Sequence, residues 1–167
     1  MFGSDHYVPV LRWKRGEQKA MRFLEPADKD ALTPLIEIPP DDFLPGNVGM
    51  APDTSGLIRR LSTTLELAIG ARTAFVDFGL LAYGGIPIEP AGAITQFFEL
   101  LDGGGVTAVP VTGVARPESY QAATRPIAMQ RRALALRQSS YSLRIASARG
   151  HGDTGARSLA CRQSSPL

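Results

Sequence analysis

The sequence is poor in the residue types that build thiol and metal centres. It contains one cysteine, Cys161, and two histidines, His6 and His151. A lone cysteine excludes an internal disulfide and offers no cysteine pair to a metal, and two histidines argue against a histidine-rich zinc centre. The GxSxG, CxxC, HExxH and GxxxxGK[ST] patterns are also missing, so no familiar catalytic motif identifies a reaction.

Long hydrophobic runs are missing as well. The chain has no stretch of about 18 apolar residues and no basic leader followed by an apolar segment. We therefore expect a cytoplasmic protein that is neither secreted nor embedded in a membrane. The 167 residues, 44% of them apolar and 20% charged, have the size and composition of one soluble globular domain.

Lysine is absent after Lys29, and charge is divided unevenly along the chain. Residues 1–115 hold nine lysines and arginines against fourteen acids, whereas residues 116–167 hold nine arginines against only Glu118 and Asp153. Residues 138–167 lack a sustained helical or strand period, and we interpret them as an irregular tail. Its origin stays open between a disordered basic arm that binds nucleic acid and out-of-frame translation of GC-rich DNA, the interpretation that we favour.

What the first 137 residues do contain is a regular alternation of short apolar runs and amphipathic segments. Strand composition is found at 7–13, 35–39, 73–81, 106–114 and 132–137. Helical patterns occupy 14–32, interrupted at Pro26, and then 56–70, 90–105 and 116–130. This order predicts an α/β fold made of parallel β/α repeats.

Two architectures fit these repeats: a TIM-barrel-like fold and an open doubly wound sheet. A complete barrel needs about 250 residues. We therefore expect residues 1–137 to form the N-terminal half of a barrel-like domain, as the truncated portion of a longer protein. The open sheet edges of such a half favour self-association.

Charged side chains interrupt the predicted strands and raise the question of a site. Glu37 lies inside "LIEIP" (35–39) and Asp77 inside "TAFVDFGLL" (73–81), where an unpaired carboxylate is costly. Side chains alternate between the faces of a strand, so Arg12, Lys14, Glu37 and Asp77 are expected to converge at the carboxyl ends of the strands, where barrels carry active sites.

Two interpretations of this convergence stay open. In the structural one, Glu37 or Asp77 forms a buried ion pair with Arg12 or Lys14 and has no chemical role. In the functional one, Lys14, Glu37 and Asp77 are catalytic and Arg12 binds the substrate. Glu37 and Asp77 could also hold Mg²⁺, which prefers oxygen ligands.

Several spaced motifs resemble those of the beta protein family, named from a protein of T-even bacteriophages. The order of "PLIEI" (34–38), "FVDFGLL" (75–81) and "VPVTG" (109–113) fits the family, and so does an opening motif made of Tyr7, Pro9, Val10, Leu11, Arg12, Lys14, Gly16 and Glu17. The resemblance spans residues 7 to about 137. It implies a barrel-like β/α fold and an association with phage and mobile-element genes, but no established reaction.

Three functional hypotheses follow. The first is a metal-dependent enzyme that acts on a phosphate-containing or nucleic-acid substrate. The second is a non-catalytic module that binds nucleic acid or a protein partner in a phage-defence or mobile-element system. The third is a fragment that has no activity alone and associates through its open sheet edges.

Overall fold

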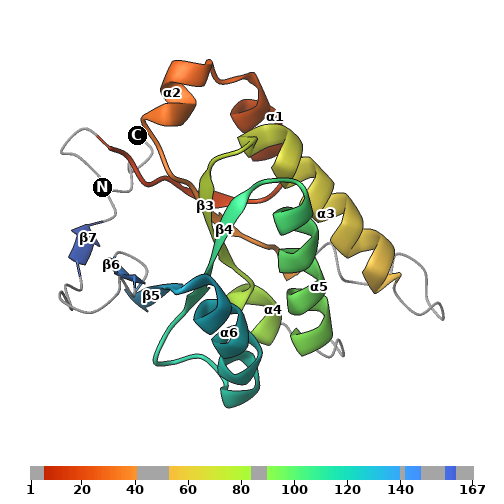
Figure 1. Cartoon of the computed structure of the whole chain (residues 1–167), viewed down its shortest axis with the longest axis vertical. Helices are drawn as coiled ribbons and strands as arrows, with labels where there is room; N and C mark the ends of the chain where they lie inside the picture. The colour runs from red at the N-terminus through yellow and green to blue at the C-terminus, as the bar shows by residue number, and fades with distance from the viewer. Residues whose placement is uncertain (1–5, 41–52, 84–89, 140–141, 148–156, 161–167) are drawn as a thin grey trace.

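The computed structural model describes residues 6–40, 53–83, 90–139, 142–147 and 157–160. Its strands form one sheet whose spatial order follows the order of the sequence (Figure 1). Five of them pair in parallel: β1 (Val10–Arg12), β2 (Leu35–Glu37), β3 (Thr73–Asp77), β4 (Thr107–Thr112) and β5 (Ala133–Ser139).

Helices alternate with these strands as the sequence predicts. They are α1 (Arg15–Phe23), α2 (Pro26–Asp30), α3 (Thr54–Ile69), α4 (Gly79–Tyr83), α5 (Pro90–Gly103) and α6 (Glu118–Arg131). Pro26 begins α2, because proline suits the first turn of a helix but not its interior. Asp53 caps α3 by accepting a hydrogen bond of 2.9 Å from the N–H of Gly56. The helix ends at Gly70, which has a φ of 67°.

The sheet is open and is not closed into a barrel. This agrees with the open-sheet alternative and confirms the predicted α/β class with parallel β/α repeats. Each parallel strand lies beside the next one in the chain, as successive strands do in a β/α barrel. None of the helices in the described ranges is long and apolar enough to cross a bilayer.

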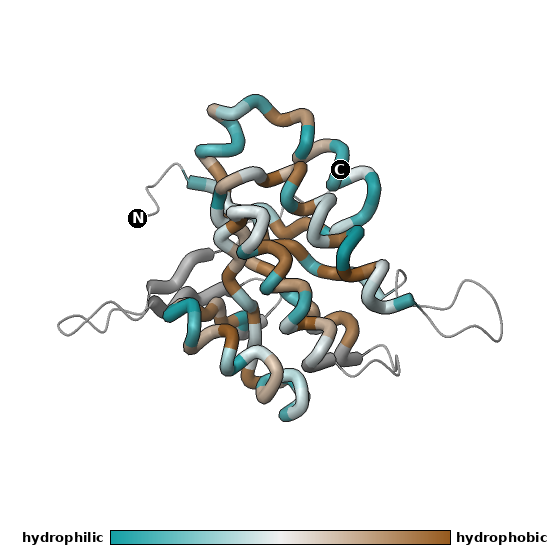
Figure 2. Tube along the Cα trace, turned by 45° about the vertical axis from the view of Figure 1, so that its right-hand side comes forward, coloured by the Kyte–Doolittle hydropathy of each residue, from teal (hydrophilic) through white to brown (hydrophobic). Residues whose placement is uncertain are grey.

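Alternate residues of each strand enter two hydrophobic clusters, one on each face of the sheet. The larger cluster joins Ile36 and Val76 to the apolar sides of α1, α3, α5 and α6, and it includes Phe78, Phe97 and Phe98. The rings of Phe78 and Phe97 meet edge to face with centroids 5.0 Å apart. Figure 2 shows hydrophobic residues concentrated where these helices meet the strands.

The smaller cluster lies on the opposite face of the sheet. It consists of buried side chains from the strands and the residues just before them: Val8, Leu35, Phe75, Val109, Val111 and Ala135. Glu37 and Asp77 follow Leu35 and Phe75 by two residues and therefore point to this second face, at the carboxyl ends of their strands.

The segment 138–167, which we expected to be irregular, contains strand structure. β6 (Ser142–Ser147) pairs antiparallel with β5, and β7 (Arg157–Ala160) pairs antiparallel with β6. "SLRIAS" (142–147) has its two large apolar residues, Leu143 and Ile145, two positions apart, a strand period too short to stand out from the arginine-rich composition around it.

Candidate functional site

A row of charged residues crosses three neighbouring strands at their carboxyl ends. The strand register pairs Arg12 of β1 with Glu37 of β2, and Glu37 with Asp77 of β3. Arg12 is exposed, Glu37 is half-buried, and Asp77 is only 1% exposed. Three of the four predicted site residues therefore lie side by side.

Asp77 is surrounded by hydrogen-bond donors. Its Oδ2 accepts a bond of 2.6 Å from Nη2 of Arg116, which lies between β4 and α6, and its Oδ1 accepts a bond of 2.7 Å from the N–H of Gly79. Burial raises the pKa of the Asp77 carboxyl above its ordinary value, and the charges of Arg116 and Arg137 and the bond from Gly79 oppose this shift without cancelling it.

Arg137 of β5 connects the two acids. Its Nη1 donates to Oε1 of Glu37 and, over 3.2 Å, to Oδ2 of Asp77. Burial lowers the pKa of Arg137, but the hydrogen bond and charge of Glu37, together with Asp77, outweigh burial and leave that pKa raised. Two carboxylates and two guanidiniums thus form one ion-pair network, and its residues come from β2, β3, β5 and the β4–α6 connection.

Two glycines make room for this network. A Cβ atom on Gly79 would lie 1.6 Å from Nη1 of Arg116, so a side chain there would collide with the guanidinium. A Cβ atom on Gly113 would lie 2.4 Å from the backbone oxygen of Arg137, so this glycine allows β5 to approach β4 closely. Both glycines follow buried strands in the sequence, at 79 and 113.

Tyr120 connects the ends of β3 and β4 next to Asp77. Its hydroxyl donates to the carbonyl of Val111 over 2.8 Å and accepts a bond of 3.2 Å from the N–H of Phe78. Burial, and then the charge of Asp77, raise the pKa of the Tyr120 hydroxyl, so it stays protonated. Arg116 also lies 5.8 Å from the centroid of the Tyr120 ring, which restricts the guanidinium further.

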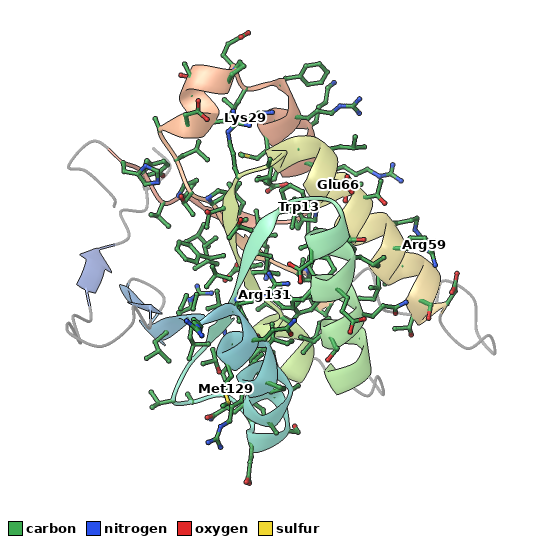
Figure 3. All side chains as sticks on the ribbon, in the orientation of Figure 1. Trp13, Lys29, Arg59, Glu66, Met129 and Arg131 are labelled. Carbon is green, nitrogen blue, oxygen red and sulfur yellow. The ribbon has the colours of Figure 1, made fainter. Side chains whose placement is uncertain are left out.

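Lys14, the remaining predicted catalytic residue, lies elsewhere. It lines a hollow of about 590 Å³ between α1 and α3, together with Arg15, Arg60 and Thr64. The neighbouring Trp13 is buried and donates from Nε1 to Oγ1 of Thr64 over 3.3 Å (Figure 3).

The predicted magnesium site stays a prediction. Within the described ranges, no group of three or more histidine, cysteine, aspartate or glutamate residues is arranged to hold a metal ion. The oxygens that Glu37 and Asp77 could offer to Mg²⁺ accept hydrogen bonds from Arg116 and Arg137. A divalent cation would therefore compete with two guanidiniums.

The comparison with known families decides the classification. A model of the beta protein family matches residues 7–154. The chain belongs to the beta protein family. The resemblance carried by the opening motif, "PLIEI" and "VPVTG" is thereby confirmed, and the match continues 17 residues beyond residue 137, through β6. No curated protein matches this beta protein family member.

Sequence reasoning missed the two arginines that complete the site in this beta protein family chain. Arg116 stood at the start of a predicted helix, and Arg137 at the edge of the supposed tail. One signal could have found Arg137: it follows Ala135 by two residues at the carboxyl end of a predicted strand, the same position that Glu37 and Asp77 occupy. For Arg116, no local pattern indicates a partner 39 residues earlier.

Proposed function

We propose that this chain binds a phosphate-bearing ligand at the carboxyl edge of its sheet, through Arg137 and Arg12. The observation that carries the proposal is the way in which Arg137 is held. Both of its described hydrogen bonds to Glu37 and Asp77 use Nη1, which leaves Nη2 and Nε as donors toward a ligand. Guanidinium forks of this kind suit phosphate oxygens.

Three further considerations support the proposal. Successive parallel strands lie side by side in this sheet, as in β/α barrels, and barrels carry their sites at the carboxyl ends of the strands, which is where the network lies. Well-packed apolar residues in the same place often stabilise a fold as much as a buried ion-pair network does. Stability alone therefore does not explain why charged residues occupy these positions. Arg12 is exposed and pairs in register with Glu37, so three arginines accompany two carboxylates at this edge, a surplus of positive charge for an anion.

A titration with inorganic phosphate and with a labelled single-stranded oligonucleotide tests this function. We expect Arg12→Gln to weaken binding about tenfold, since it removes one charge-assisted contact, and the matched Arg59→Gln on the exposed side of α3 to leave it unchanged. Binding of phosphate alone would assign a small ligand. Salt-sensitive binding of the oligonucleotide would assign nucleic acid. Equal binding by both variants, or no binding, would reject the proposal.

A second candidate is acid–base chemistry on the bound ligand, and the raised pKa of Asp77 favours it. A carboxylate whose pKa is raised by burial is a better proton acceptor near neutral pH. In this candidate Asp77 is the general base, and Glu37 positions Arg137. A turnover assay on phosphoester substrates in which Asp77→Asn retains full activity would eliminate it.

A further inference from the structure

Among the described residues, the helices on one face of the sheet form a row whose last member is α6. Along this row α1 packs against α3, α3 against α5, and α5 against α6 (Figure 1). Strand β5 is followed by the antiparallel strand β6 and not by another helix. The flank of α6 away from α5 therefore borders a hollow of about 790 Å³, whose other wall includes Leu134 and Leu136 of β5.

The hollow has the form of a groove along a helix. It is lined by residues from Glu118 in the first turn of α6 to Arg132 just after its last turn, and a helix of 14 residues is about 21 Å long. Ala122 and Ala128 allow close approach, and Met129 is 70% exposed on the same flank (Figure 3). The length of the groove and its small side chains suit the packing of another helix against α6.

A buried hydroxyl at this groove also lacks its hydrogen bond. Thr112, at the end of β4, lines the hollow and is 8% exposed. Among the described residues, its Oγ1 is the buried side-chain polar atom that has no hydrogen-bond partner. An unsatisfied buried hydroxyl costs free energy, and a polar side chain entering the groove would remove that cost.

Charges along the groove show which helix would fit. Glu118, Arg125 and Arg132 are exposed, line the hollow and follow one another at intervals of seven residues. Seven residues are about two helical turns, so Glu118 and Arg125 stand in one line along α6, and Arg132 caps the end of the helix beside the same hollow. Two arginines against one glutamate favour a partner helix that carries acids along its facing edge.

We propose that the groove between α6 and β5 binds an amphipathic helix of another protein, with a narrow apolar face and acidic residues opposite Arg125 and Arg132. This helix continues the row α1, α3, α5, α6 and covers Leu134, Leu136 and Met129. It also provides a partner for the hydroxyl of Thr112. The mode is helix-in-groove recognition, in which apolar anchors supply affinity and flanking charges supply selectivity.

Two designed peptides test the proposal with the full chain. Each is about three heptads long, with leucine and alanine on one face; one carries glutamates along the flanking positions and the other lysines. Fluorescence anisotropy should show the glutamate peptide binding at least about tenfold more tightly. The double variant Arg125→Glu/Arg132→Glu should reverse this preference, and a gain of binding by the lysine peptide cannot result from unfolding.

Further variants separate the groove from general charge effects. Arg22→Glu/Arg59→Glu, a matched double reversal at exposed positions of α1 and α3, should leave the preference unchanged. Thr112→Val should weaken binding while the chain alone melts at an equal or higher temperature. Equal binding of both peptides, or a preference unaffected by the double reversal at α6, would overturn the proposal. Self-association that Ala128→Glu abolishes would overturn it too and assign the groove to a second copy.

Discussion

Arg116 compensates the charge of a carboxylate that is almost completely buried. Its side chain is 11% exposed and that of Asp77 is 1% exposed. We predict that Arg116→Gln lowers the free energy of unfolding by about 3–5 kcal/mol at neutral pH, because it leaves a buried charge with less compensation. Arg59→Gln, an exposed control, should change it by less than about 0.5 kcal/mol. Urea denaturation measures both.

The pH dependence of Arg116→Gln provides a second readout. The pKa of Asp77 is raised in the folded state, so Asp77 binds a proton there before it does in the unfolded chain, and protonation favours folding. Loss of Arg116 raises this pKa further. The stability deficit of Arg116→Gln should therefore shrink as the pH falls from about 7 to about 5. A deficit that is constant with pH would show that the charge of Asp77 is not its cause.

Gly79 belongs to the same network through its missing side chain. A Cβ atom there would lie 1.6 Å from Nη1 of Arg116, so we predict that Gly79→Ala displaces the guanidinium and destabilises the fold by about 1–3 kcal/mol. The matched control is Gly92→Ala in α5, where the added methyl group would meet no atom within 4 Å apart from the nearby backbone of its own helix. That change should stabilise by about 0.5–1 kcal/mol. Thermal melting of both variants tests this prediction, and equal changes in melting temperature would contradict it.

At the scale of elements, Arg131 joins the last turn of α6 to its neighbours. Its Nη1 donates to the carbonyl of Ala108 and its Nη2 to that of Phe98, each over 2.9 Å, while Nη2 lies 2.7 Å from Oδ2 of Asp102 (Figure 3). Arg131→Leu should cost about 2–4 kcal/mol, since two carbonyls lose a charged donor and Asp102 loses its ion-pair partner. The single ammonium group of Arg131→Lys cannot reach both carbonyls, so this variant should recover less than half of the stability that Arg131→Leu loses. Arg125→Leu on the exposed side of α6 is the control for denaturation experiments.

Element positions were predictable because their signals are local. The strand 35–39 and the helix 56–70 follow directly from apolar spacing, Pro39 and Gly70, and the structure has β2 and α3 there. The strand predicted at 73–81 was too long: β3 ends at Asp77 and α4 begins at Gly79, because an apolar run alone does not distinguish the end of a strand from the start of a helix. Facing directions were also predictable from local signals, which brought Glu37 and Asp77 together. What the pattern could not supply was the partner of each acid, because Arg137 is 100 residues from Glu37 in the chain.

For the whole molecule, the least predictable feature is the end of the sheet. The arginine-rich composition of residues 138–167 concealed the strand period, so the strands that continue the sheet beyond β5 were not expected. Their pairing matters because β5 would otherwise present an unpaired edge, which invites association with other chains. β6 pairs with β5 from Ala133↔Ser147 to Ser139↔Ser142 and covers that edge.

Removing residues 140–167 tests whether these strands belong to the fold. We predict that the shortened chain loses at least about 2 kcal/mol of stability, because β5 gives up the hydrogen bonds of its antiparallel ladder. It should also associate with itself through the uncovered edge, and sedimentation velocity would show larger species that increase with concentration. Because Arg137 belongs to β5, its contact with Glu37 should loosen as well. A shortened chain that is monomeric and melts like the full one would instead support the interpretation of residues 138–167 as a dispensable tail.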